Sequence, residues 1–290
     1  MSVLSSSPAR LSTALLVVAG VLWGTGGLAG ALLQSAAGIS PVAVAAYRLL
    51  VGGGLAAAAV VAAGHLRYLR GRVARTRLVI SGVLLAQFQA AYQVAVAEIS
   101  VSLATLITIG CVPVVVVGVG AVRERRLPAT RTSVAVLGSV AGLLLLSGGP
   151  AGVDAWHTVV GVTMSVLAGA GFAVLTLVTA RPVPGQHAIT SFGLLLGGLL
   201  LAPFAAPVPL TADVLTLVAF LGLVPTAVAY GAYFVGLRHA HPTAAALATM
   251  LEPLTATVLS VCLHDEHLTG TGVLGAVLIA GALGLYYVRR

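Results

Sequence analysis

The chain has 290 residues, of which 59% are hydrophobic and 8% are charged, and its mean hydropathy is +1.09. Soluble domains carry about 25% charged residues, so the composition excludes an ordinary soluble domain and indicates that lipid is the solvent for most of the chain. The formal net charge of +8 comes from Arg residues in short connectors between apolar runs, which excludes the continuous basic face of a nucleic-acid-binding protein.

Uncharged apolar runs of about 20 residues recur along the chain, and each is long enough to cross about 30 Å of hydrocarbon as a helix. The runs lack the period-two alternation of transmembrane β-strands. The sequence therefore predicts an all-α integral membrane protein with ten transmembrane helices, at about residues 12–33, 41–63, 77–97, 100–122, 132–148, 157–180, 187–206, 213–237, 242–263 and 269–288.

The Arg residues accumulate in every second connector of this layout. They are Arg10, Arg67, Arg70, Arg72, Arg75, Arg77, Arg123, Arg125, Arg126, Arg131, Arg181, Arg238, Arg289 and Arg290. The alternate connectors carry no Arg and instead hold the acidic residues Glu98, Asp154, Asp213, Asp265 and Glu266. Because basic residues stay on the cytoplasmic side, the pattern predicts a multi-pass inner-membrane protein with both termini in the cytoplasm.

A weak internal repeat divides the chain into two halves, residues 1–148 and 149–290. The stretch from Tyr92 to Leu146 matches the stretch from Tyr233 to Leu285, with Pro113 and Pro253 in corresponding places. Each half has five predicted spans, and since five is odd, the second half is inverted relative to the first. Such five-plus-five inverted-topology repeats within one membrane domain are typical of secondary transporters, whose substrate site lies near the midplane.

Two charged residues fall inside predicted spans, Arg48 in the second and Glu252 in the ninth. Burying such a group costs about 2.5–3.5 kcal/mol on insertion scales. Their predicted heights differ by about 5 Å, which allows a direct or water-bridged pair. Glu252 is thus a candidate substrate or proton site, and a structural ion pair or a neutral carboxyl is the alternative. For Arg48 the structural role is favoured.

Polar side chains also share helix faces. Gln89, Tyr92 and Gln93 lie on one face of the third span, and Tyr230 and Tyr233 form a pair on the eighth. A polar face of this kind avoids lipid, so it either joins helices or lines a cavity.

Glycines interrupt the first span in the run Trp23-Gly24-Thr25-Gly26-Gly27. They predict a distorted helix, since Gly costs about 1 kcal/mol relative to Ala, or close helix packing through small residues. Both readings are compatible.

Signatures of membrane enzymes and cofactor sites are missing: the sequence has no His-Glu-x-x-His, no Gly-x-Ser-x-Gly and no phosphate loop. The run His264-Asp265-Glu266-His267 carries metal-ligand residue types, but four adjacent residues in one turn cannot converge on a single ion. We therefore expect neither a metal nor a cofactor, and no catalytic residue.

The layout resembles the EamA-type branch of the drug/metabolite transporter superfamily over nearly the whole chain. The residues that carry the resemblance are Trp23-Gly24, Arg48, Pro113, Glu124, Gly138 and Gly142 in the first half, and Leu251-Glu252-Pro253, Glu266, Gly275 and Gly281 in the second. The resemblance implies a central cavity that opens alternately to each side, and usually export of amino acids or related metabolites. It places Trp23, Gln89, Tyr92, Gln93, Tyr230, Tyr233 and Glu252 near that cavity.

We therefore expect a secondary transporter that moves a small solute through the bilayer, with Glu252 and Arg48 as candidates for proton or charge coupling. A membrane-embedded enzyme acting on a lipid-linked substrate and a non-transporting membrane subunit are the alternatives. The substrate, the coupling ion and the choice between monomer and homodimer stay open.

Overall fold

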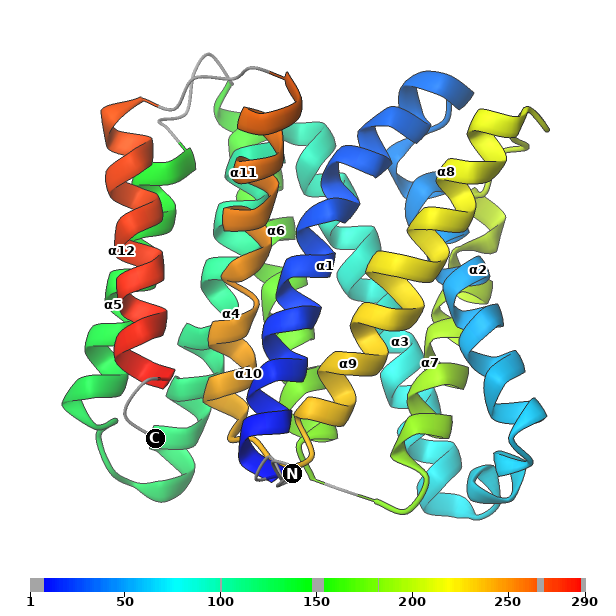
Figure 1. The fold of residues 1–290 in the computed structure, drawn as a ribbon, viewed down its shortest axis with the longest axis horizontal. Coiled ribbons are helices and arrows are strands. Elements are labelled where there is room, and N and C mark those ends of the chain that lie inside the picture. Colours follow the sequence, from blue (N-terminus) through cyan, green and yellow to red (C-terminus); the bar gives the residue numbers. More distant parts are fainter. Residues whose placement is uncertain (1–7, 100, 148–153, 182, 265–268, 288–290) are drawn as a thin grey trace, which may run out of the picture.

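The computed structural model describes residues 8–99, 101–147, 154–181, 183–264 and 269–287 (Figure 1). Within these ranges the regular elements are helices. They are α1 (Pro8–Ala37), α2 (Pro41–Ala62), η1 (His65–Leu69), α3 (Arg72–Glu98), α4 (Val101–Glu124), α5 (Thr130–Ser147), α6 (Ala155–Thr179), α7 (Gln186–Leu201), η2 (Ala202–Phe204), α8 (Ala212–Gly222), η3 (Leu223–Val228), α9 (Ala229–Gly236), α10 (Pro242–Ala248), α11 (Leu251–His264) and α12 (Gly270–Tyr287).

Eight of the described stretches are long and apolar enough to cross a membrane. Two predicted spans do not meet that length, because α5 is short and the ninth span is divided into α10 and α11 around Thr249 and Met250. The prediction of an all-α membrane protein is confirmed, and the count of ten spans stays a prediction. The start of α2 follows the expected chemistry: Ser40 caps the helix by accepting the N–H of Ala43 at 3.2 Å, and Pro41 takes the first position.

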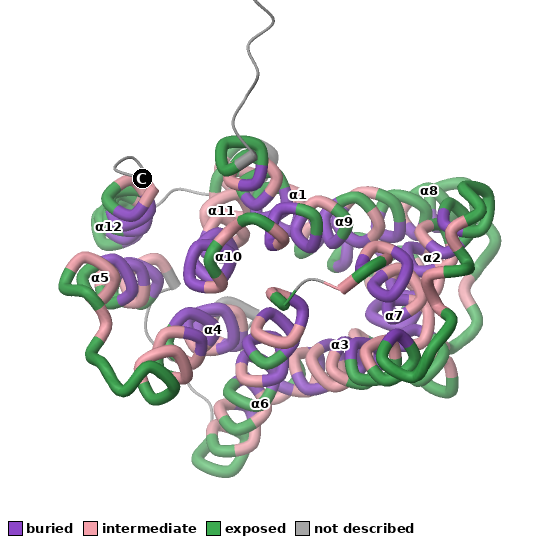
Figure 2. Tube along the Cα trace, turned by 90° about the horizontal axis from the view of Figure 1, so that it is seen from below, coloured by how far each residue is buried: buried purple, intermediate pink, exposed green. Residues whose placement is uncertain are grey.

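The helices form two rows closed by a helix pair at each end (Figure 2). One row contains α10 and α11, α1, α9 and α8, and the other contains α4, α6 and α3. The α5–α12 pair closes one end and the α2–α7 pair closes the other. In this view the buried residues lie between the helices and the exposed residues lie outside.

Large apolar side chains cover much of the outer surface. Val166 is 44% exposed, Leu199 is 55% exposed and Val277 is 61% exposed. In water such a surface would aggregate, whereas in hydrocarbon it is well solvated and the helices satisfy their own backbone groups. The exterior therefore fits a bilayer.

Glycines set the closest helix crossings. A Cβ on Gly53 of α2 would overlap the backbone of Leu194 and Leu195 in α7, and a Cβ on Gly198 of α7 would lie 2.6 Å from the nitrogen of Leu50. In α1, Gly20 and Gly24 pack in the same way against the α10–α11 segment. The helix α1 is not interrupted at these glycines, and Gly20 and Gly24 act in packing.

We predict that Gly53→Ala destabilises the protein, because the added methyl group would force α2 and α7 apart, and overpacking of this kind costs about 1–3 kcal/mol. The neighbouring Gly54 is the matched control, since nothing lies within 4 Å of a Cβ there. Gly54→Ala should leave the melting temperature of the purified protein unchanged or raise it. Equal melting temperatures for the two variants would contradict the packing of α2 on α7.

Candidate functional site

A small cavity lies between the two rows of helices. It is lined by Trp23, Arg48, Phe88, Gln89, Tyr92, Thr108, Ile109, Phe172, Tyr230, Thr249 and Glu252. These residues come from α1, α2, α3, α4, α6, α9 and the α10–α11 segment. The cavity has a volume of about 30 Å³, which is room for about one or two water molecules. The structure is thus nearly closed around this site.

Aromatic rings form one wall of the cavity around Trp23. Its ring centroid lies 5.2 Å from that of Tyr230 and 5.7 Å from that of Phe172, both in edge-on contact. Trp23 is 6% exposed, and its indole N–H finds no acceptor among the protein groups that the structure describes. An unsatisfied buried donor is destabilising by about 1–3 kcal/mol, so an acceptor on a bound solute would stabilise this wall.

Hydroxyl and amide groups also line the cavity. The Tyr92 hydroxyl is hydrogen-bonded to Thr105 Oγ1 at 2.7 Å, which joins α3 to α4. The Thr108 hydroxyl donates to the carbonyl of Ser165 at 3.2 Å, which joins α4 to α6. Gln89 is 2% exposed on the same face of α3 as Tyr92. Polar groups in a cavity of this kind fix the orientation of a solute.

The Arg48 side chain is held by an irregular turn of the eighth predicted span. Pro225 has no N–H to give to the carbonyl of Leu221, and the hydroxyl of Thr226 donates to that carbonyl instead, at 2.7 Å. The helix there takes the wider π form, η3. Arg48 donates through Nη2 to the carbonyl of Pro225 at 3.4 Å and through Nε to Thr226 Oγ1 at 3.3 Å.

Glu252 lies at the interruption between α10 and α11. Pro253 cannot donate to the carbonyl of Thr249, and the N–H of Glu252 donates to it at 3.0 Å in a tighter turn. The interruption places Thr249 and Glu252 together in the cavity wall. The carboxyl group of Glu252 is thereby presented in the first turn of α11, directly after the interruption.

Arg48 and Glu252 line the same cavity, yet no nitrogen–oxygen contact within 4.0 Å joins them in the described part of the chain. The direct pair that the sequence allowed is therefore absent from this conformation. The two opposite charges are both left facing the cavity, where a solute or water can lie between them.

Six of the eight predicted site residues line the cavity: Trp23, Arg48, Gln89, Tyr92, Tyr230 and Glu252. Gln93 and Tyr233 do not. Tyr233 is fully buried behind Trp23, at 5.0 Å between centroids, and its hydroxyl is hydrogen-bonded to Thr176 Oγ1 at 2.7 Å. Gln93 is 7% exposed and lies outside the lining.

Sequence reasoning did not assign Phe88, Thr108, Ile109, Phe172 and Thr249 to the site. A signal for Phe172 existed in the repeat. Phe172 follows Gly169 by three residues, as Trp23 follows Gly20, and the two glycines make matching contacts with α4 and with the α10–α11 segment. Aligning α1 with α6 would therefore have placed Phe172 opposite Trp23.

A larger cavity of about 530 Å³ opens at the end of the molecule where α4 stops and α10 starts. Arg123, Glu124, Arg126, His241, Thr243 and Tyr286 are among its lining residues. Its wall is thus rich in charged and polar groups.

The run at 264–267, which we expected not to bind a metal, lies largely outside the described residues, since 265–268 are not described.

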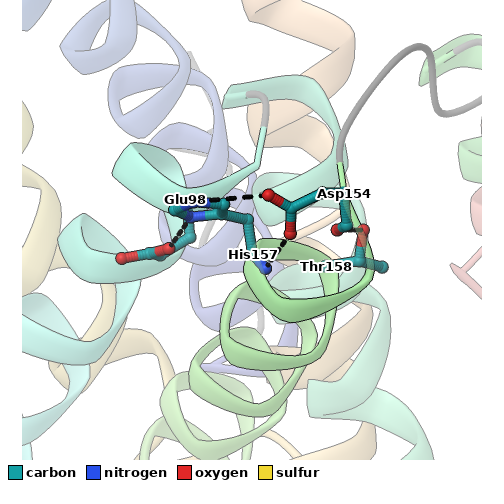
Figure 3. A network of polar contacts seen from close by, with 4 residues as sticks. All are labelled: Glu98, Asp154, His157 and Thr158. Atoms are coloured by element: carbon teal, nitrogen blue, oxygen red, sulfur yellow. Dashed lines mark hydrogen bonds and ion pairs between the residues drawn. The ribbon is translucent and has the colours of Figure 1, made fainter.

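A polar network at the opposite end joins α3 to α6 (Figure 3). His157 Nδ1 lies 2.5 Å from Glu98 Oε2, and His157 Nε2 lies 3.6 Å from Asp154 Oδ2. Asp154 also caps α6 by accepting the backbone N–H of His157 at 3.0 Å, and this hydrogen bond lowers the pKa of Asp154 below its usual range. The ion pair is solvent-exposed, so it holds the two helix ends only weakly.

We predict that Arg48→Met lowers the melting temperature of the purified protein, because the carbonyl of Pro225 loses its donor and Glu252 loses the neighbouring positive charge. A lost hydrogen bond from a charged group costs about 1.5–3 kcal/mol. Arg75→Gln is the control, since Arg75 is exposed and its side chain bonds only the nearby carbonyl of Gly71 in the described structure. A melting temperature for Arg48→Met equal to that of Arg75→Gln would show that Arg48 contributes no stability.

Comparison with known proteins agrees with this architecture. Residues 159–288 match the model of the EamA-like transporter family. The chain is 29% identical over 278 residues to the uncharacterized transporter YwfM of Bacillus subtilis (strain 168), a match that covers 94% of this chain and 91% of the relative. A solved crystal structure with 21% sequence identity superposes with a TM-score of 0.80 over 96% of each chain, which shows a shared fold. The second half of this all-helical membrane chain thus resembles EamA-like transporters, and nearly the whole chain is similar to a transporter relative.

Proposed function

We propose that the protein is a secondary carrier that exports a small metabolite, an amino acid or a related compound, across the inner membrane by alternating access. The observation that carries this proposal is the central cavity, which combines an aromatic wall with one cationic and one acidic side chain. A zwitterionic solute matches that combination, because its carboxylate pairs with Arg48 and its ammonium group pairs with Glu252.

The size of the cavity favours a moving structure over a fixed pore. A volume of about 30 Å³ is too small for an amino acid, so the rows of helices must separate on one side for a solute to enter. The larger polar cavity between α4 and α10 is the proposed approach route on the side of the Arg-rich connectors. Alternating separation on the two sides would carry the solute across.

Matching contacts support two repeats, residues 1–148 and 149–290. A Cβ on Gly20 in α1 would overlap the carbonyl oxygen of Ala248 and lie 2.9 Å from the Cβ of Leu251. A Cβ on Gly169 in α6 would overlap the carbonyl oxygen of Thr108 and lie 2.8 Å from the Cβ of Cys111. The contacted residues correspond in the two repeats, because Thr108 and Ala248 have the same separation along the chain as Cys111 and Leu251. Helix α1 therefore meets the α10–α11 segment in the same way as α6 meets α4.

The end pairs support an inverted arrangement. In the α5–α12 pair, a Cβ on Gly142 would lie 2.9 Å from the nitrogen of Ile279, and a Cβ on Gly275 would lie 2.6 Å from the nitrogen of Leu146. A glycine of each helix thus contacts the backbone of the other helix, as Gly53 and Gly198 do in the α2–α7 pair. Such reciprocal contacts are typical of two equivalent antiparallel helices related by a two-fold axis. It fits ten crossings in a five-plus-five repeat.

We assign solute contact to Trp23, Gln89, Tyr92, Tyr230 and Glu252, with Arg48 as the cationic group. Gln93 and Tyr233 would act from behind, by holding α3 and α9 in place. If protons drive transport, Glu252 is the residue that would carry them, because a carboxyl in the cavity is accessible from one side at a time. The EamA-type family and its transporter relative favour this function over an enzymatic one.

We predict that the two sets of connectors lie on opposite sides of the membrane. In a variant with Cys111 and Cys262 replaced by Ser, Leu127→Cys should react with a membrane-impermeant maleimide only from the cytoplasmic side. Trp156→Cys should react only from outside. Leu127 is 93% exposed and Trp156 is 71% exposed, so both sites are reachable by the reagent. Labelling of Leu127→Cys in intact cells, or of both sites from the same side, would overturn the proposed topology.

We predict that Glu252→Gln abolishes proton coupling. Uptake of a labelled amino-acid mixture into proteoliposomes should rise with an imposed pH gradient for the wild-type protein and should be independent of the gradient for the variant. The stimulation of uptake by the gradient should be at least about tenfold smaller in the variant, which corresponds to about 1.4 kcal/mol.

Gln93→Ala is the matched control, since Gln93 is buried but lies outside the cavity lining. It should retain the response to the gradient. A gradient response in Glu252→Gln equal to that of the wild-type protein would remove Glu252 as the proton carrier.

A further inference from the structure

A second cluster of basic and aromatic side chains lies away from the central cavity, where η1, α7 and α9 meet. His187 Nε2 lies 3.0 Å from His65 Nδ1, and Arg238 Nη2 lies 3.4 Å from His187 Nδ1. The ring of Tyr68 packs edge-on against both histidines, with centroids 5.5 Å from His65 and 5.8 Å from His187. These elements meet at the end of the molecule where α1 starts and α12 stops (Figure 1).

The hydrogen bonds fix the proton positions in this cluster. Arg238 can only donate, so His187 Nδ1 accepts and its proton is on Nε2. That N–H then donates to His65 Nδ1. The resulting chain from Arg238 through His187 to His65 holds the guanidinium in place. Within the described residues, Arg238 uses only Nη2 in a side-chain hydrogen bond, so its other N–H groups can serve a ligand.

The cluster borders an open pocket of about 580 Å³ whose wall includes Tyr68, Gly185, His187, Arg238 and His239. A neighbouring cavity shares Tyr68 and adds Arg67 and Arg70. Among the described residues no carboxylate lies within 4.0 Å of these three Arg side chains. Their positive charge is therefore not neutralised by the protein, which favours an anion.

The first turn of α7 also faces this pocket through Gly185. This residue has a φ of +72° and leaves no space for a side chain, since a Cβ there would overlap the Tyr68 ring. The 16-residue helix α7 starts at the next residue, Gln186. Its N-terminal end carries a partial positive charge that adds to the attraction of an anion.

An apolar groove continues from the charged pocket. It has a volume of about 50 Å³, shares His187 and Arg238 with the pocket and lies between α2, α7, η3 and α9. Its other lining residues are Ala56, Thr190, Ser191, Leu194, Ala227, Gly231, Phe234 and Val235. A Cβ on Gly231, in the same wall, would meet nothing within 4 Å. A cationic pocket joined to an apolar groove at the end of a membrane helix matches a molecule with a charged head and a hydrocarbon tail.

We propose that this pocket binds the phosphate group of an anionic phospholipid, with the start of one acyl chain in the groove beside Gly231 and the rest of that chain along the outer face of α9, where Val235 is 39% exposed. Arg238 and His239 bind the phosphate oxygens, and Arg67 and Arg70 add positive charge from the adjoining cavity. The same phosphate chemistry would also suit inorganic phosphate, which lacks the acyl chain. The groove favours the phospholipid over inorganic phosphate, because only the phospholipid has an acyl chain to place there.

Native mass spectrometry of the purified, delipidated protein tests the proposal. The full chain is titrated in detergent with phosphatidylglycerol, phosphatidylcholine or inorganic phosphate. We expect one phosphatidylglycerol to bind at least about tenfold more tightly than phosphatidylcholine, as one or two charge-assisted hydrogen bonds provide. Arg238→Gln should remove this preference. Arg75→Gln, a change of the same charge outside all three cavities, should retain it.

Gly231→Leu provides a second, independent test. The new side chain fills the groove without overlapping protein atoms at its Cβ, so it should weaken phosphatidylglycerol binding by about tenfold. If Arg238→Gln does not yield a folded protein, Gly231→Leu decides alone. Equal phosphatidylglycerol binding by the wild-type protein and Gly231→Leu overturns the proposal. So does tight inorganic phosphate binding that Gly231→Leu leaves unchanged, which would indicate a site for free phosphate.

Discussion

The structure depends on the requirement that backbone N–H and C=O groups find partners inside the protein, because hydrocarbon offers none. Continuous helices such as α1 meet this requirement by themselves. The helices around Pro113, Pro225 and Pro253 do not, because each proline removes an N–H from the middle of a predicted span. The helix α4 continues through Pro113, whereas the segments at Pro225 and Pro253 are irregular. At Pro225 the hydroxyl of Thr226 replaces the missing donor to Leu221, and Arg48 donates to the carbonyl of Pro225.

The cavity lies where these two irregular segments face α3, α4 and α6. Arg48 reaches the cavity through its contact with η3, and Glu252 reaches it through the interruption after α10. A regular helix pairs its own backbone groups, whereas an irregular segment leaves some of them free. Both charged residues therefore lie next to backbone with free polar groups. Local irregularity, charge and aromatic surface coincide at one place, as is typical of solute sites in membrane carriers.

Close glycine contacts hold the rest of the assembly together, away from the large aromatic side chains that line the cavity. The α2–α7 and α5–α12 pairs approach until backbone touches backbone, which gains dispersion energy in a medium without a hydrophobic driving force between helices. These two pairs close the ends of the molecule, while the rows that contain α1, α3, α6 and α9 face each other across the cavity. In the proposed alternating-access cycle, the end pairs would be the fixed points about which the rows move.

The sequence by itself determined the all-helical membrane class, the position of nearly every helix and most of the cavity-lining residues. Hydropathy and helix signals such as Ser40-Pro41 are local properties, since insertion of a segment depends on its own transfer free energy. The spacing of Gln89 and Tyr92 on one helix face is local too, and both residues line the cavity.

Only the tertiary structure decided which side chains from different helices meet. The rotation of each helix depends on glycine contacts with a neighbour, which is why Phe172 and Thr249 line the cavity while Tyr233 lies behind Trp23. The hydrogen-bond partner of Arg48 was likewise decided by the tertiary structure. A carbonyl of η3 receives its hydrogen bond because the π turn at Pro225 brings that group, and not Glu252, within reach.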